Sequence, residues 1–192
     1  MNRLVNISFR LSLLVLMLAL ISGCNSSQSQ NNGDETQPER RKSPVVIAHV
    51  KHNDTYIKIV YGQPYKRGRV IFGNLVPYGK VWRTGANEAT EMTVTRDIMF
   101  GGKKVKGGTY ALFTIPHKDD WTVILNNDLG QWGAFEYNSD SDYLRFTVHS
   151  EKIDQTVEAF TMKFGEVEDN VTTLTLMWDQ TQVSIPIRFL DT

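Results

Sequence analysis

The chain has 192 residues and carries 21 basic and 21 acidic side chains, so its formal net charge is zero. A chain without a basic excess is not a typical nucleic-acid-binding protein, and we expect no nucleic-acid partner. The sequence contains a single cysteine, which excludes an internal disulfide and a zinc site built from several cysteines. The fold must therefore be stabilised by its apolar core.

The first 23 residues have the pattern of a secretory signal peptide. Arg3 and Arg10 are basic, residues 11–21 are apolar apart from one serine, and the small residues Ser22 and Gly23 follow. The apolar run is shorter than the about 20 residues that a membrane-spanning helix needs. We expect this segment to be removed, which would also remove two basic residues and leave a small acidic excess.

The residues around the predicted cleavage site indicate a lipid anchor. The sequence Ile21-Ser22-Gly23-Cys24 resembles the lipobox of bacterial lipoproteins. This resemblance implies that the sulfur of Cys24 carries a diacylglycerol and that the chain is cut just before it. An ordinary signal peptide with an incidental cysteine is the alternative. Because Asn25 and not an aspartate follows, known sorting signals favour the bacterial outer membrane, with the domain in the periplasm; display on the cell surface stays open.

Residues 24–44 are predicted to be the lipidated cysteine and a disordered tether. Residues 25–44 contain no large apolar side chain, so they cannot bury enough surface to offset the entropy of ordering. A flexible chain of this length spans about 25 Å on average. The remaining residues, 45–192, are of ordinary size for one domain.

The domain shows apolar and polar residues in alternation, which is typical of β-strands. The clearest stretches are 143–149, 173–179 and 182–189. The pair Asp179-Gln180 between the last two predicts a tight hairpin, and Pro186 favours an edge position for the last strand. Glycine pairs at 101–102 and 107–108 mark turns between short strands. Further strands are predicted over 45–50, 55–61, 90–95, 109–115, 120–126 and 157–164.

These patterns predict an all-β fold. No window of 12 or more residues has a helical stripe, and many short strands at similar spacing are typical of a sandwich or barrel. We expect a single-domain, two-sheet β-sandwich, either jelly-roll-like or immunoglobulin-like.

Residues 62–89 do not fit the strand pattern and form the candidate functional segment. A long irregular segment in a compact domain is either functional or a sign of misassigned elements. It mixes aromatic side chains with several cations and has a single acid, Glu88. Aromatic faces beside guanidinium groups suit sugars, carboxylates or phosphates. The predicted ligand-binding residues are Tyr65, Tyr78, Trp82, Arg83, Asn87 and Glu88.

A structural interpretation of the same residues stays open. Irregular loops need polar side chains to satisfy their backbone groups. Arg83, Asn87 and Glu88 could serve only that purpose, while the aromatic rings close one end of the core.

The stretch Tyr61–Thr90, YGQPYKRGRVIFGNLVPYGKVWRTGANEAT, resembles the hallmark of the bacterial family called domain of unknown function 2911. The following stretch GGKKVKGGTYALFTIPHKDDWTVILNND is similar to that family too, and the resemblance covers roughly residues 45–190. It implies an envelope-associated protein, often secreted or lipid-anchored. The resemblance assigns no catalytic or binding residue to this sequence, because none is established for the family.

Metal and cofactor sites are not predicted. His49 and His52 are three residues apart and would face opposite sides of a strand. Asn138, Asp140 and Asp142 resemble the start of an EF-hand loop, but the glycine and glutamate that this loop requires are missing. A weaker calcium site of another kind stays open at this turn.

Three functions remain as hypotheses. The first is a non-catalytic envelope module that binds a small polar ligand, anionic or carbohydrate. The second is a structural or assembly lipoprotein that recruits a protein partner, suggested by the tether and the predicted edge strand. The third is a hydrolase of envelope glycans or esters that uses Arg83, Asn87, Glu88 and a distant histidine; a carboxylate pair of Glu88 and Glu91 is disfavoured by their odd spacing.

Overall fold

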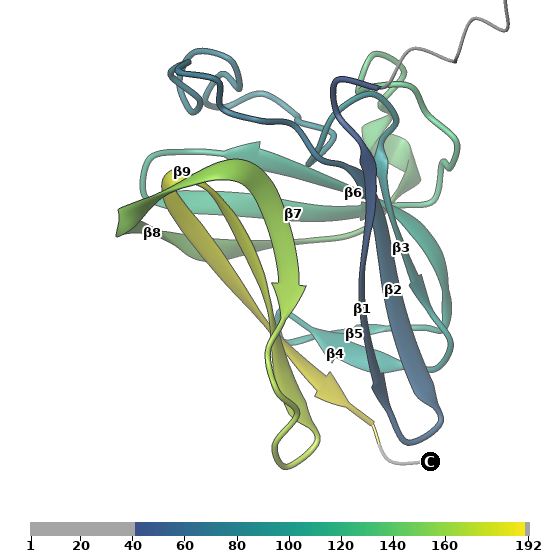
Figure 1. The fold of residues 1–192 in the computed structure, drawn as a ribbon. Coiled ribbons are helices and arrows are strands. Elements are labelled where there is room, and N and C mark those ends of the chain that lie inside the picture. Colours follow the sequence, from purple (N-terminus) through teal and green to yellow (C-terminus); the bar gives the residue numbers. More distant parts are fainter. Residues whose placement is uncertain (1–40, 191–192) are drawn as a thin grey trace, which may run out of the picture. The chain divides into compact units, whose positions relative to one another are not determined.

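A computed structural model describes residues 41–190, which form an antiparallel sheet of nine strands (Figure 1). The predicted signal peptide, Cys24 and the tether up to residue 40 lie outside the described residues. No helix within the described part is long and apolar enough to span a membrane. The elements are β1 (Val45–His52), β2 (Thr55–Gly62), β3 (Thr90–Val94), β4 (Ile98–Phe100), β5 (Lys103–Val105), β6 (Gly108–Pro116), β7 (Asp120–Asn126), the 3₁₀ helix η1 (Ser139–Ser141), β8 (Asp142–Phe164) and β9 (Val171–Phe189).

The all-β prediction is confirmed, whereas the two-sheet sandwich is not. The strands follow one another in the order β1-β2-β3-β6-β7-β8-β9-β4-β5 without a break in hydrogen bonding. The sheet is continuous because β8 is long enough to serve two neighbours. Its residues 142–149 pair with β7, and its residues 150–164 pair with β9. Figure 1 shows the C-terminal strands, in yellow-green, as long and strongly bent ribbons.

The predicted C-terminal hairpin at Asp179-Gln180 is wrong, because residues 171–189 form one strand. The register between β8 and β9 passes from Lys152 opposite Thr181 to Val157 opposite Asp179. The pair Asp179-Gln180 thus lies opposite a bulge in β8 and does not form a turn. The actual turn precedes β9 at Asp169 and Asn170, where both residues have positive φ, as a two-residue hairpin turn requires.

Pro186 does not lie on an edge strand either. Strand β9 has β8 on one side and β4 on the other. The ladder with β8 ends at Val183, and the ladder with β4 begins at Ile187. Pro186 therefore sits between the two ladders, where its missing N–H interrupts neither.

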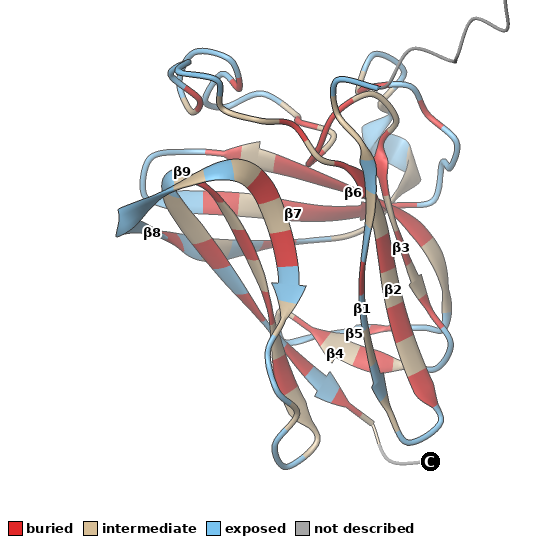
Figure 2. Cartoon of the chain, in the orientation of Figure 1, coloured by how far each residue is buried: buried red, intermediate tan, exposed pale blue. Residues whose placement is uncertain are grey.

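The bent sheet encloses one large apolar core, visible as the red bands on facing strands in Figure 2. Alternate residues of β2, β3 and β9 point into it, which is why the period-two pattern located these strands. A second, small cluster lies elsewhere on the sheet. It consists of Ala89, Ala111, Phe113 and Ile124, with the partly buried Ala134 and Tyr137 of the loop between β7 and β8 packed against it.

The chain that follows β2 is attached to the middle of β8. The backbone N–H of Lys66 donates to the carbonyl of Glu158 at 2.7 Å, and the N–H of Phe160 donates to the carbonyl of Pro64 at 2.9 Å. These bonds form where β8 bulges between Val157 and Thr161 and stops pairing regularly with β9. The bulge therefore frees backbone groups of β8 to hold the start of the irregular segment 62–89 against the sheet.

Gly62 is the most sterically constrained glycine at this junction. A Cβ at Gly62 would lie 2.0 Å from the carbonyl oxygen of Ala86, which is part of the backbone and cannot move aside freely. We expect Gly62→Ala to lower the free energy of unfolding by at least about 2 kcal/mol, because it inserts an atom into a filled space. Denaturant unfolding of the variant measures this.

Gly165→Ala is the matched control, since its Cβ would meet no atom closer than 3.8 Å. We expect that variant to stay within about 0.5 kcal/mol of the parent. Equal stability of the two variants would contradict the close approach of residues 62 and 86.

Candidate functional site

Residues 63–89 form no strand of their own but are attached to the sheet at several points. Isolated bridges join Tyr65 to Ala159 of β8, Trp82 to Thr114 of β6, and Glu88 to Trp132. The bridge at Trp82 consists of two backbone hydrogen bonds of 2.7 and 2.9 Å. The long irregular segment therefore has a defined position without belonging to a ladder.

Trp82 belongs mainly to the core. Its side chain is 8% exposed and its indole N–H donates to the carbonyl of Gly85 at 3.1 Å. The ring stacks on Trp178 at 5.9 Å between centroids and meets Phe160 edge-on at 5.0 Å. The structural interpretation is thus correct for most of this side chain, although its remaining surface borders the cavity described below.

Three residues of segment 62–89 have an unusual backbone conformation. Arg67, Thr84 and Asn87 all have positive φ, at 49°, 52° and 65°. This conformation is especially unfavourable for the β-branched Thr84. The side chain of Thr84 is fully buried and its hydroxyl lies 3.1 Å from that of Thr114. Such strain persists only where the surroundings enforce it, and it occurs often at binding sites.

A cavity of about 300 Å³ lies between the start and the end of segment 62–89. Four of the six predicted ligand-binding residues line it, namely Tyr65, Trp82, Arg83 and Asn87. Its other described lining residues are Lys42, Ser43, Pro64, Arg67, Arg69, Leu75, Val76, Gly85, Ala86 and Trp178.

The cavity is strongly basic. Lys42, Arg67, Arg69 and Arg83 line it, and no carboxylate of the described residues does. None of these four cations makes an ion pair within residues 41–190. The nearest acidic contact is that of Glu158, whose carboxylate accepts a hydrogen bond from the backbone N–H of Arg67 at 2.7 Å.

Arg83 is the most unusual of the four cations. Its Nε is buried and has no hydrogen-bond partner in the described structure. Burial lowers the pKa of its guanidinium below the ordinary value, although an arginine of this kind stays charged. A buried donor without a partner lowers the stability of the folded state.

The other arginines have their positions fixed by carbonyl groups. The guanidinium of Arg67 donates to the carbonyl of Lys42 at 2.9 Å and lies 5.8 Å from the centre of the Tyr65 ring. Arg69 donates through Nε to the carbonyl of Lys66 at 3.0 Å. These bonds orient the cations and leave their charge without compensation.

The two remaining predicted residues lie outside this cavity. Tyr78 is 39% exposed and lines a separate depression beside Lys118 and Lys152. Glu88 forms an ion pair with Arg41, and this hydrogen bond lowers the pKa of its carboxyl group. Glu88 faces a different pocket, which it shares with Val45 among others.

Three cations of the cavity are absent from the predicted binding residues. Arg67 and Arg69 could have been included, because they lie in the same basic and aromatic segment. Lys42 could not, because it belongs to the stretch predicted to be a disordered tether. Residues 41–44 in fact contact the domain: the carbonyl of Pro44 accepts from Gln63, and that of Ser43 from Asn87.

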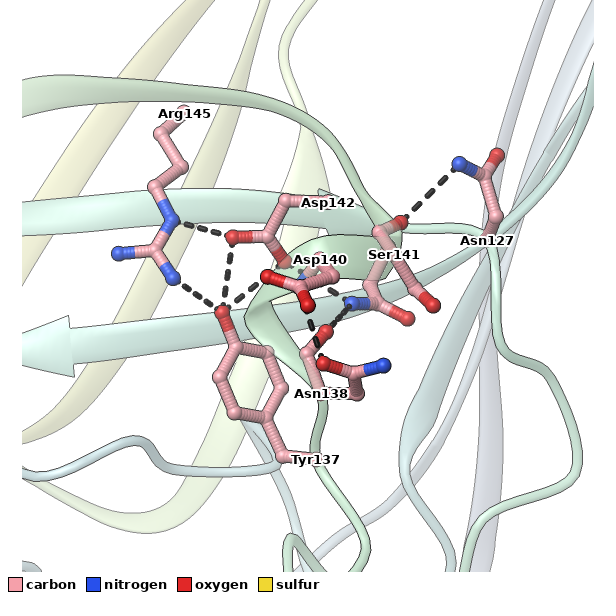
Figure 3. Close-up of polar contacts among 8 residues, drawn as sticks. Asn127, Tyr137, Asn138, Asp140, Ser141, Asp142 and Arg145 are labelled. Atoms are coloured by element: carbon pink, nitrogen blue, oxygen red, sulfur yellow. Dashed lines mark hydrogen bonds and ion pairs between the residues drawn. The ribbon is translucent and has the colours of Figure 1, made fainter.

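The aspartates at the turn before β8 form a polar network instead of an open ion site (Figure 3). Asp142, whose side chain is 9% exposed, accepts hydrogen bonds from Tyr137 at 2.8 and 2.9 Å and from Arg145. The side-chain oxygen of Asn138 caps the backbone N–H of Asp140 at 3.0 Å. Among residues 41–190, no three histidine, cysteine or acidic side chains are grouped as metal ligands would be.

This network has a consequence for stability at high pH. Burial, followed by the hydrogen bond to Asp142, raises the pKa of Tyr137 from 10.0 to about 12. The folded state therefore keeps a proton that the unfolded state loses, so stability present below pH 10 falls as the pH rises from 10 towards 12. We expect Tyr137→Phe to make this decline shallower, as measured by urea unfolding at several pH values.

Tyr110 serves as a comparison, since burial and the nearby Tyr143 also raise its pKa to about 12. Tyr110→Phe should likewise flatten the decline in stability. An unchanged slope in Tyr137→Phe would show that the Tyr137 proton does not contribute.

Comparison with known proteins identifies the family but no activity. Residues 43–187 match the model of a family described as protein of unknown function (DUF2911). No curated protein and no solved structure shows significant similarity to the chain. The match includes the whole cavity apart from Lys42, and it confirms the resemblance seen in the stretch Tyr61–Thr90. The chain belongs to the DUF2911 family.

Proposed function

We propose that this protein is a non-catalytic binding module for a small anionic ligand, and that the basic cavity is its binding site. The observation that carries this proposal is the set of four cations that line the cavity without any ion pair in the described structure. Charges of like sign gathered in one cavity repel one another, and an anion removes this repulsion.

The chemistry of the cavity favours a carboxylate or phosphate group. Arginine presents parallel N–H donors that match two oxygens of such groups, and three of the four cations that line the cavity are arginines. Asn87 adds an amide to the same wall. Tyr65 and the small exposed part of Trp82 supply an apolar surface on which a sugar ring could rest. A sugar acid or a sugar phosphate combines both features.

We propose that the protein performs this function in the bacterial cell envelope. The signal-peptide pattern and the lipobox-like residues before Cys24 support a lipid anchor, with the domain in the periplasm. A periplasmic domain would meet small anions that cross the outer membrane.

The two other hypotheses have less support. The hydrolase hypothesis needs an acid and a histidine beside Arg83 and Asn87, but Glu88 and the four histidines do not line the cavity. The partner-recruiting hypothesis relied on the tether and on an edge strand at Pro186, and it loses the second of these, because β9 lies inside the sheet.

Thermal unfolding of the full chain with a panel of anions tests the proposal. The panel contains inorganic phosphate, citrate, glucuronate and glucose 6-phosphate, with glucose as the neutral comparison. A ligand at 100 times its dissociation constant should stabilise the protein by about 2.7 kcal/mol. We expect Arg83→Gln to weaken binding at least tenfold, since a charge-assisted hydrogen bond contributes about 1.5–3 kcal/mol.

Arg96→Gln is the matched control, because Arg96 is an exposed arginine that pairs with Asp54 away from the cavity. It should bind the ligand like the parent protein. The ligand-induced shift is compared within each variant, so a change in basal stability does not affect the result. The proposal is wrong if no anion stabilises the protein or if Arg83→Gln binds as tightly as Arg96→Gln.

A further inference from the structure

Residues 41–44, which we call the strap, contact both sides of the basic cavity. Lys42 and Ser43 are among the residues that line it. The guanidinium of Arg67 donates to the carbonyl of Lys42 at 2.9 Å, and the amide of Asn87 makes a longer contact of 3.5 Å with the carbonyl of Ser43. Arg67 lies near the start of the irregular segment and Asn87 lies near its end. The strap therefore connects the two parts of the chain between which the cavity lies.

The two ends of the strap are attached differently. At one end, the carbonyl of Pro44 accepts a hydrogen bond from the N–H of Gln63 at 2.8 Å, which continues the pairing of β1 with β2. At the other end, Arg41 forms an ion pair with Glu88, and their side chains are 43% and 47% exposed. Because water screens an exposed ion pair, it contributes little to stability. The strap is thus fixed at Pro44 and held more weakly at Arg41.

The strap occupies hydrogen-bond donors that the proposed ligand needs. Arg67 and Asn87 both line the cavity, and each directs a donor at a carbonyl oxygen of the strap. A carbonyl oxygen carries only a partial charge. A carboxylate or phosphate group attracts a guanidinium through its full charge and accepts two parallel hydrogen bonds from it. A charged ligand therefore gains by replacing these carbonyls, whereas a neutral ligand does not.

We propose that the strap is a built-in competitor for the basic cavity: its carbonyl oxygens hold Arg67 and Asn87 until an anion displaces them. This inference rests on the proposed anion-binding function and adds a source of selectivity to it. A neutral sugar offers no stronger acceptor than the strap does, so it does not replace the carbonyls. The exchange frees the backbone of Lys42 and Ser43, while the hydrogen bond at Pro44 remains.

The substitution Arg41→Gln tests this competition, because it weakens the strap without changing a residue that lines the cavity. The probes are the anions of the panel above, namely inorganic phosphate, citrate, glucuronate and glucose 6-phosphate. We expect the variant to bind them about two- to fivefold more tightly, as the loss of an exposed ion pair allows. Isothermal titration calorimetry on the full chain measures this. Charge alone predicts the opposite, since the loss of a cation weakens the attraction for an anion.

Arg96→Gln is the matched control. It removes the same charge and also breaks an exposed ion pair, the one with Asp54, and neither of these residues lines the cavity. We expect the affinity of this variant for each anion to equal that of the parent protein.

Backbone dynamics give a second, local measurement. Nitrogen-15 relaxation of the Ser43 amide is measured in the parent protein, without ligand and with a saturating concentration of the anion that binds most tightly. We expect its order parameter to fall from about 0.85, the value of rigid backbone, to below about 0.6. The amide of Gln63 should stay rigid, because its hydrogen bond to Pro44 is not exchanged.

The outcomes separate this inference from the proposed function. If no anion of the panel binds to the parent protein, the cavity is not an anion site and both are wrong. If an anion binds but Arg41→Gln binds it no more tightly than Arg96→Gln does, the strap does not compete and this inference alone is overturned. It is also overturned if the Ser43 amide becomes more rigid on binding, because the strap would then form part of the occupied site.

Discussion

The hydrogen bonds between the bulge of β8 and the chain that follows β2 are the interaction on which the rest of the structure depends. Where β8 stops pairing with β9, the backbone groups of Glu158 and Phe160 form hydrogen bonds with those of Lys66 and Pro64. The carbonyl of Glu158 also accepts from the indole N–H of Trp178. In a regular strand, the backbone groups of Glu158 and Phe160 would form hydrogen bonds with the neighbouring strand. The irregular segment would then have no attachment at its start.

The same bonds create the basic cavity. They hold Tyr65 and Arg67 on one wall, while the bridge between Trp82 and Thr114 holds Arg83 on the other. The cavity is unfavourable for the folded state by itself, since its walls contain unpaired cations and a buried donor without a partner, and the neighbouring Thr84 has a strained conformation. Strained residues cluster at ligand-binding sites, which supports the binding site proposed above.

The irregular segment between β2 and β3 supplies most of the residues that line the basic cavity. The loop between β7 and β8 supplies none of them and packs instead, through Ala134 and Tyr137, on the small cluster that contains Phe113 and Ile124. The hydrogen-bond network of Tyr137, Asp142 and Arg145 holds this loop in position.

The sequence by itself determined the fold class, the family and the position of most strands. Short runs of apolar residues, alternating or continuous, are a local property, so they located β1, β2, β3, β6 and β7 to within one or two residues. The sequence also marked segment 62–89 as exceptional and named four residues of the cavity. Only the tertiary structure decided that residues 173–179 and 182–189 form a single strand, that Pro186 is internal, and that Tyr78 and Glu88 point elsewhere while Lys42 joins the site. Those outcomes depend on which distant segments pair with β8 and β9, and alternation within a strand carries no information about its neighbours.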